Sequence, residues 1–271
     1  MTEPLIRPLV GLGERQAAVE LQRRVWGDFD DLVPASILMI AQETGGVASG
    51  AFIGDRLVGF VFGLSGLRDG EGVHWSDMLA VDPGYRGQGI GIGLKLHQRD
   101  LLLEEGIQTV RWTFDPLEAT NAHINLRRLG AFSREYRRDL YGASPSPLHA
   151  GIGTDRLVVE WAIGSRRVAG RLAGDDRPRE HGDAPILNPP VYAHGEPSPG
   201  STVRAPDGRV VRVAIPWDIH ALKSGDLETA VAWRRNVRAA LEVAFREGYT
   251  AVDLERGEDA ARYILVRGFE R

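Results

Sequence analysis

Cysteine is missing from this sequence of 271 residues. Its absence excludes disulfide bonds, thiolate metal sites and any covalent intermediate on a protein thiol. The seven histidines do not replace it as metal ligands, because they are scattered without the short spacing that a metal site requires. The sequence therefore predicts no metal site.

A broad excess of positive charge is missing as well. The formal net charge is −4, and Lys95 and Lys223 are the only lysines. The isoelectric point is about 6.0. A protein that binds nucleic acid nonspecifically needs a broad basic surface to neutralise phosphates. We therefore expect no nucleic acid among the partners of this protein.

Long apolar runs are the third absence. No run approaches the roughly 20 apolar residues that span a bilayer, and residues 1–8 lack the apolar stretch of a signal peptide. The apolar fraction of 43% and the charged fraction of 26% are those of an ordinary soluble protein. We expect a cytoplasmic protein of one large or two modest domains, without a membrane partner.

The first part of the chain alternates between the patterns of helices and strands. Apolar residues three or four positions apart predict a helix over residues 14–26, and Pro34 can open a second helix. Two strands joined by a short Gly-Asp turn should pair antiparallel, and a third strand follows them. These strands cover residues 47–53, 57–64 and 73–81.

Glycines at positions 84, 87, 89, 91 and 93 follow the third strand and lead into a helix that ends near Gly106. The chain then continues with a strand, a short helix and two more strands. They cover residues 109–114, 120–129, 133–141 and 156–163. The elements together predict a mixed α/β domain over residues 1–164.

The composition changes after this domain. Residues 165–209 are rich in glycine, proline, aspartate and arginine, which predicts an irregular linker or long loop. Residues 210–271 predict a smaller α/β segment of a strand, a long helix capped by Asp226 and two further strands. Residues 246–252 resemble residues 104–110. A degenerate internal repeat and a chance resemblance explain this similarity equally well.

The glycine-rich turn predicts an anion site. The first N–H groups of a helix lack partners and lie at its positive end, where they can hold phosphate oxygens. Gly87, Gly89 and Gly91 allow close approach and positive φ, and Arg86 adds a cation. The spacing excludes a P-loop, because Lys95 is not followed by serine or threonine, and it excludes the dinucleotide fingerprint as well.

The residues Arg86-Gly87-Gln88-Gly89-Ile90-Gly91, directly after the strand that ends at Pro83, resemble the GNAT superfamily of acetyltransferases. The resemblance covers roughly residues 4 to 163 and implies a GNAT-like N-terminal domain, with residues 210–271 as a possibly degenerate second copy. It implies acetyl-CoA as co-substrate, with the diphosphate on the turn and the pantetheine arm along the preceding strand. The residues so implied are Leu79, Ala80, Val81, Arg86, Gly87, Gln88, Gly89, Ile90, Gly91, Asn121 and Asn125.

Acylation of an amine requires a base for the amine and an acid for the departing thiolate. Asp77, two residues before Leu79, is the first candidate base, and His74 is the second. In many family members a tyrosine hydroxyl protonates the leaving thiolate, and this chain has Leu126 at the position of that tyrosine. Tyr136 and Tyr141 are the nearest replacements, although a tyrosine in such a place is more often a wall or core residue.

These observations predict an N-acetyltransferase in which an amine attacks acetyl-CoA directly in a ternary complex, since no cysteine can carry the acyl group. The acceptor is a small-molecule or peptide amine of unknown identity. A homodimer is one possible oligomeric state. Leu126 in the acid position leaves a non-catalytic acyl-CoA sensor open as an alternative. A structural module whose glycine turn is a relic is a further alternative.

Overall fold

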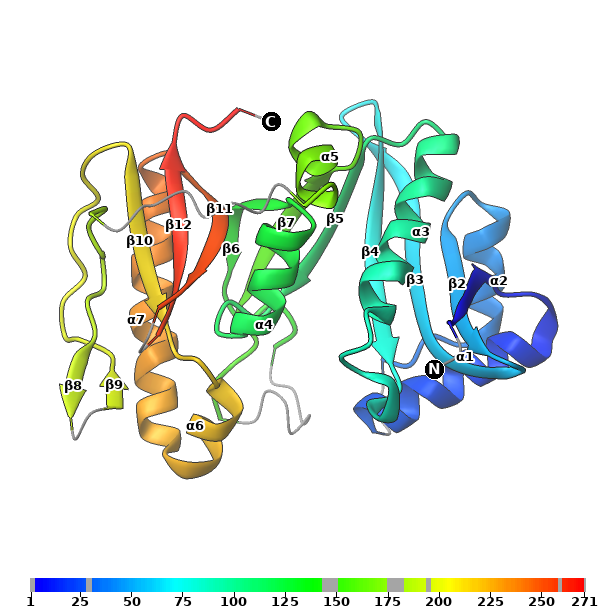
Figure 1. Cartoon of the computed structure of the whole chain (residues 1–271), viewed down its shortest axis with the longest axis horizontal. Coiled ribbons are helices and arrows are strands. Elements are labelled where there is room, and N and C mark those ends of the chain that lie inside the picture. Colours follow the sequence, from blue (N-terminus) through cyan, green and yellow to red (C-terminus); the bar gives the residue numbers. More distant parts are fainter. Residues whose placement is uncertain are drawn as a thin grey trace. The chain divides into compact units, whose positions relative to one another are not determined.

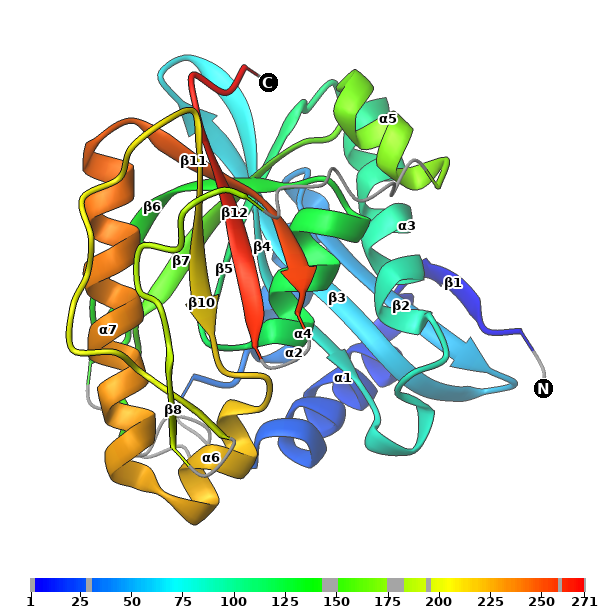
Figure 2. The ribbon, with the colours of Figure 1, turned by 60° about the vertical axis from the view of Figure 1, so that its left-hand side comes forward.

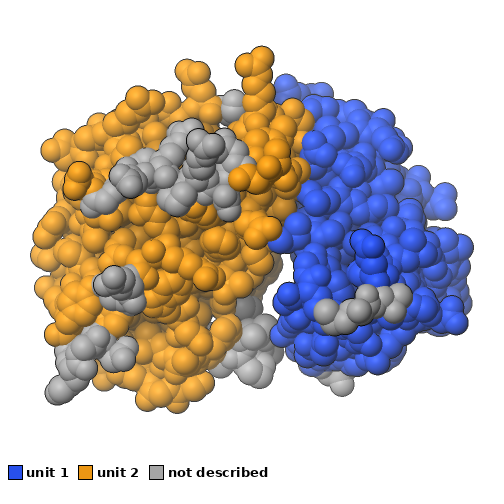
Figure 3. Space-filling model, viewed as in Figure 1, with its two compact units in different colours: residues 1–112 blue, residues 113–271 orange. Residues whose placement is uncertain are grey.

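The computed structural model describes residues 3–27, 31–142, 151–174, 183–193, 196–257 and 260–270. The chain forms two compact units, Met1–Trp112 and Thr113–Arg271, which Figure 3 distinguishes by colour. Each unit is described by itself. Within the described ranges, no helix is both long enough and apolar enough to cross a membrane.

The first unit is built on a sheet in the order β1-β2-β3-β4-β5 (Figure 1). Neighbours from β1 to β4 are antiparallel, whereas β5 runs parallel to β4. The strands are β1 (Leu5–Pro8), β2 (Val47–Ile53), β3 (Arg56–Arg68), β4 (Glu71–Val81) and β5 (Thr109–Phe114). The predicted hairpin and third strand are thereby confirmed, with β3 and β4 longer than the patterns indicated.

Helices cover both faces of this sheet (Figure 2). On one face, α1 (Gly11–Trp26) and α2 (Ala35–Glu43) bury Leu21 and Leu38 against Phe60 and Phe62. On the other face lies α3 (Ile90–Glu104), whose buried residues include Ile90, Leu94 and Leu102. All three predicted helices are present, and the burial of apolar side chains on each face holds the three layers together.

A β-bulge divides β4. Phe62 pairs with Met78 and Gly63 with Ser76, so Asp77 is an extra residue without an opposite partner on β3. The extra residue exchanges the two faces of the strand. Met78 therefore packs with α1 and α2, while Ser76 and Lys95 of α3 share a hydrogen bond.

The second unit has a sheet in the order β7-β6-β11-β12-β10, with antiparallel neighbours throughout. The long helix α7 (Leu227–Arg246) begins at Asp226, whose carboxylate accepts from the N–H of Thr229 as a helix cap. The strands are β6 (Phe132–Arg137), β7 (Arg156–Ala162), β10 (Val210–Ile215), β11 (Tyr249–Arg256) and β12 (Ala261–Arg267). The predicted strands and capped helix of residues 210–271 are present.

Shorter elements complete the second unit. The predicted helix over residues 120–129 consists of α4 (Ala119–Ala122) and the π-helical turn η2 (His123–Arg128). The predicted linker over residues 165–209 contains α5 (Arg166–Leu172) and a hairpin of β8 (Val191–Ala193) and β9 (Glu196–Ser198), and α6 (Ile219–Gly225) follows β10. The domain limits predicted from the sequence and the repeat in residues 210–271 stay predictions.

Candidate acyl-coenzyme A site

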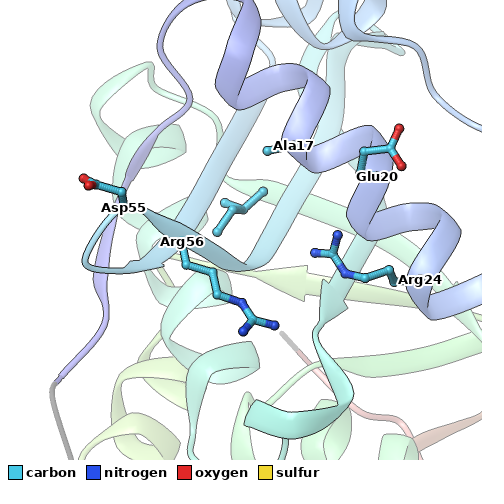
Figure 4. A pocket seen from close by; sticks show the side chains of 6 residues that line it. Ala17, Glu20, Arg24, Asp55 and Arg56 are labelled. Atoms are coloured by element: carbon cyan, nitrogen blue, oxygen red, sulfur yellow. The ribbon is translucent and has the colours of Figure 1, made fainter.

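Asp82 fixes the start of the glycine turn. It directly follows β4, and its Oδ1 accepts from the N–H of Gly84 at 3.2 Å, which caps the 3-10 turn η1 (Pro83–Tyr85). Its Oδ2 lies 3.1 Å from Nη2 of Arg56 and 3.6 Å from Nε of Arg24. The same two arginines line a surface pocket beside α1 and the β2–β3 turn (Figure 4). The turn is therefore anchored to the body of the first unit.

The turn itself needs glycine at two positions. Gly87 has φ of 75° and Gly89 has φ of 79°, in the left-handed region that L side chains rarely adopt. The N–H of Gly93 bonds to the carbonyl of Gly89 at 2.9 Å, so α3 begins immediately after the turn. No described residue accepts a hydrogen bond from the N–H groups of residues 87–92.

The space beside two of the turn's glycines is open. A Cβ atom added to Gly87 or Gly89 would meet no heavy atom within 4 Å. Ile90, by contrast, is only 3% exposed and anchors the first turn of α3 to the sheet. The result is a rigid helix start with six unoccupied N–H groups, which is the geometry of an anion site.

Beyond Trp75, no strand among the described residues pairs with the second edge of β4. The strand β5 pairs with β4 only at Val73, His74 and Trp75. The N–H of Asp82 bonds to the carbonyl of Val58 on β3. Since hydrogen-bonded and outward-facing positions alternate along an antiparallel pair, the backbone of Ala80 faces β3 and that of its two neighbours faces away.

Leu79 and Val81 therefore present their backbone groups at the open edge. Arg86 already uses one of them, because its Nε donates to the carbonyl of Val81 at 3.2 Å. A strand edge with free donors and acceptors can bind an extended chain as an additional strand. Ala80 offers no free backbone group to such a ligand, although the sequence placed it in the site.

The two candidate bases lie in different environments. Asp77, the bulge residue, is solvent-exposed, and partial loss of hydration raises the pKa of its carboxyl while a hydrogen bond to Trp75 opposes the rise. His74 is fully buried, with Nδ1 2.9 Å from Oγ of Ser65 and Nε2 3.0 Å from Nε2 of Gln98. Burial and the charge of Lys95 lower the pKa of His74 to about 3. His74 is thus a neutral core residue with both nitrogens engaged.

The two candidate tyrosines belong to the second unit. The hydroxyl of Tyr136 donates to Oδ2 of Asp155 at 2.5 Å, and burial together with this carboxylate raises the pKa of Tyr136. Tyr141 is 53% exposed, and its hydroxyl lies 2.9 Å from Oγ1 of Thr113. Tyr136 is therefore committed to a structural hydrogen bond, while Tyr141 remains accessible.

Three further predicted positions lie on α4 and η2. Asn121 is exposed and Asn125 is buried, and the backbone carbonyl of Asn125 accepts from the N–H of Ala131 at 2.9 Å. Their contact with a coenzyme stays a prediction. Leu126, which stands where many family members have tyrosine, is fully buried in the core.

The sequence did not single out a polar network beneath β4. Nζ of Lys95 lies 2.6 Å from Oγ of Ser76 and 3.3 Å from Oε1 of Gln98. The same nitrogen lies 4.0 Å from the centre of the Trp112 ring. Burial lowers the pKa of Lys95 to about 7. The available signal was a lysine and a glutamine three residues apart on the apolar face of one helix.

No group of three or more histidine, aspartate or glutamate side chains within the described ranges could hold a metal ion. The site therefore consists of main-chain donors, an open strand edge and the side chains around them.

Comparisons with known proteins locate the same region. The family model described as "Acetyltransferase (GNAT) family" matches residues 16–130. A comparison with curated protein sequences found no match.

Among solved structures, the chain is similar to the ribosomal-protein-S18-alanine N-acetyltransferase from Escherichia coli, with 19% identity over 60% of this chain and 95% of that one and a TM-score of 0.47. It is also similar to a GNAT-family acetyltransferase from Streptococcus pneumoniae, with 16% identity, coverage of 60% and 100%, and a TM-score of 0.48. An aminoglycoside 6'-N-acetyltransferase complexed with coenzyme A shows 15% identity, coverage of 60% and 98%, and a TM-score of 0.45.

The matched residues contain β4, the glycine turn and α3 in one continuous stretch. The motif, its place between strand and helix, and the free donors at the helix start agree with the family match. The chain therefore carries a GNAT acetyltransferase domain at residues 16–130.

Proposed function

We propose that the protein is an N-acetyltransferase that binds acetyl-CoA through residues 86–91 and transfers the acetyl group to an amine. The observation that carries this proposal is the set of six N–H groups over residues 87–92 that lack a partner among the described residues. A diphosphate accepts several hydrogen bonds at once and is stabilised at the positive end of a helix. Arg86 adds a positive charge beside it.

The open edge of β4 is the proposed place of the pantetheine arm. Its amide groups would pair with the carbonyl of Leu79 and the N–H of Val81 as a neighbouring strand does. The arm then runs along β4 from the turn towards the bulge at Asp77. This direction brings the thioester to the point where β5 stops pairing with β4.

Direct attack by the amine is the proposed mechanism. A backbone N–H at Leu79 would polarise the thioester carbonyl and stabilise the negative charge that develops on its oxygen. Asp77 is accessible and its pKa is raised, which suits it to accept the proton of the attacking amine. His74 does not suit this role, because it is buried, both of its ring nitrogens are hydrogen-bonded and its pKa is lowered to about 3.

The test of the binding site compares Gly89→Asp with Gly89→Asn. Both side chains have the same size, and Asn tolerates the left-handed backbone of position 89 better than most residues. The aspartate adds a negative charge beside the diphosphate. We expect titration calorimetry to give acetyl-CoA a dissociation constant at least tenfold higher for the Asp variant than for the Asn variant. Equal affinities would contradict this placement of the diphosphate.

A non-catalytic acyl-CoA sensor is the second candidate function. It is favoured by Leu126, which leaves the usual acid position without a hydroxyl. Release of free thiol from acetyl-CoA separates the two functions when measured with spermidine, an aminoglycoside, a peptide with a free N-terminus and a lysine peptide. Turnover with any of them supports the enzyme. Tight binding without turnover on the whole panel supports the sensor.

A further inference from the structure

A buried lysine with no acidic partner lies directly beneath the bulge of β4. Lys95 is 7% exposed, and no described carboxylate forms an ion pair with it. Its hydrogen-bond acceptors are the hydroxyl oxygen of Ser76 and the amide oxygen of Gln98. A buried positive charge without a counter-ion is costly, and replacement by an apolar side chain would avoid that cost.

We propose that Ser76, supported by Lys95, delivers the proton that the coenzyme thiolate takes up when the acyl group leaves. Ser76 would touch the sulfur, whereas Lys95 would act through Ser76 as a positioning residue. This inference rests on the proposed function, because it places the thioester at the open edge of β4. It supplies the acid that Leu126 cannot provide.

The position of Ser76 carries the first part of the inference. Trp75 is the last residue of β4 that pairs with β5, so Ser76 is the first residue along the open edge. The bulge turns its side chain to the face covered by α3. Lys95 lies on α3, about one turn after the helix start that would hold the diphosphate. The helix α3 thus places Lys95 behind Ser76.

The surroundings of Lys95 carry the second part. From α3 it meets Gln98, from β4 it meets His74 and Ser76, and from β5 it meets Trp112. Of these only His74 titrates, and it is neutral near pH 7. The positive charge of Lys95 is therefore not cancelled by its neighbours, and it favours a negative charge on any atom that reaches Ser76.

Lys95 can also release a proton near neutral pH. Burial lowers its pKa to about 7, so the charged and neutral forms are both accessible. A general acid works best when its pKa lies near the operating pH. Lys223, the other lysine, lies on α6 in the second unit and plays no part in this network.

The proton balance of the step is complete. The amine nitrogen forms a bond to the thioester carbon, and the carbon–sulfur bond breaks, leaving a thiolate. The Ser76 hydroxyl, which donates to Oε1 of Gln98 at 2.9 Å, leaves this hydrogen bond and gives its proton to the sulfur. The Lys95 ammonium then gives a proton to Oγ of Ser76. The proton lost by the amine passes to Asp77 and from there to solvent, and solvent restores the charge of Lys95.

The thiol of bound coenzyme A tests this inference without an acceptor. Thiolate absorbance is followed against pH for the wild type, Lys95→Met, Ser76→Ala and the control Lys223→Met. An opposite charge at this range lowers an acid's pKa by about one to three units. We expect the bound thiol to titrate at least one unit higher in Lys95→Met, in the same direction in Ser76→Ala, and unchanged in Lys223→Met.

The same variants are then assayed for acetyl transfer with the amine panel. For Lys95→Met we expect kcat to fall at least a hundredfold with little change in the KM for acetyl-CoA, and the alkaline limb of the kcat profile to disappear. Circular dichroism and coenzyme affinity verify that each variant is folded.

Two results would overturn the inference at different levels. Identical thiol titrations and pH profiles in the wild type and a folded Lys95→Met variant would remove the role of Lys95 and Ser76 alone. Failure of the wild type to bind acetyl-CoA, or to transfer acetyl to any amine of the panel, would remove the proposed function and this inference together.

Discussion

Burial changes the protonation of two side chains in the first unit. It lowers the pKa of Lys95 to about 7 and, with the charge of Lys95, that of His74 to about 3. Both residues therefore bind fewer protons in the folded chain than in the unfolded chain over part of the pH range. Stability depends on pH wherever the two states bind different numbers of protons.

The sign for Lys95 follows from this difference. The unfolded chain keeps its lysine charged up to about pH 10.4, whereas the folded chain loses the charge near pH 7. The wild type should therefore gain stability as pH rises from 7 to 10. We expect Lys95→Met to be more stable than the wild type at pH 6, with the difference shrinking towards pH 10. Urea unfolding of both proteins from pH 6 to pH 10 measures this difference in the free energy of unfolding. A difference that does not change with pH would contradict the lowered pKa of the buried Lys95.

The residues of the glycine turn could be predicted from the sequence because their requirement is local. Positive φ at Gly87 and Gly89 and a helix start at Ile90 depend on neighbours along the chain. The environment of His74 could not be predicted this way, because its burial depends on Ser65 and on Gln98 of α3. The lysine network was missed for the same reason.

At the scale of elements, β3 and β4 approach each other so closely at Gly63 that no side chain larger than hydrogen fits there. A Cβ atom on Gly63 would lie 2.3 Å from Nε2 of His74 and 2.4 Å from the carbonyl oxygen of Trp75. Gly66, on the same strand, has no heavy atom within 4 Å of an added Cβ.

We therefore expect Gly63→Ala to lower the free energy of unfolding by roughly 1–3 kcal/mol, because overpacking forces the backbone apart. Gly66→Ala should change it by less than about 0.5 kcal/mol. Chemical denaturation of both variants provides the measurement. Equal stabilities would show that β3 and β4 can separate at low cost.

The presence of β4 could be predicted, but the exchange of its faces could not. Apolar and small residues over residues 73–81 indicate a strand, and the structure has one there. The bulge depends on how β3 meets β4, since Asp77 has no opposite residue. Strict alternation would have placed Ser76 with Met78, on the face of α1 and α2.

At the scale of the whole molecule, the elements could be predicted from local patterns, and the domain limit at residue 164 stays a prediction. The structure divides into compact units after Trp112. Ser133 of β6 pairs with Ala251 of β11, more than a hundred residues further along the chain. Partners at such distances leave no local pattern in the sequence, so the grouping requires the structure.

The second unit depends on a buried ion pair of similarly long range. Arg234 of α7 bonds Asp115 through two nitrogens, at 2.8 and 2.5 Å, and its side chain is 3% exposed. Arg138, by contrast, pairs with Glu242 while 60% exposed.

We expect Arg234→Met to lower the free energy of unfolding by about 3–5 kcal/mol, because it leaves the Asp115 carboxylate buried without its main partner. Arg138→Met should cost less than about 1 kcal/mol, since exposed pairs contribute little. Thermal and urea unfolding of the two variants compare the same substitution in both settings. A similar loss in both would mean that Asp115 finds another partner or takes up a proton.

The placement of Lys95 has a practical consequence for labelling. Succinimidyl esters react with unprotonated, accessible side-chain amines, and the chain offers only Lys95 and Lys223. While α3 is docked on its sheet, a dye should attach to the side chain of Lys223 alone. A dye located on Lys95 by mass spectrometry of proteolytic peptides would then record an event in which α3 lifted away, so its yield over time would measure such openings.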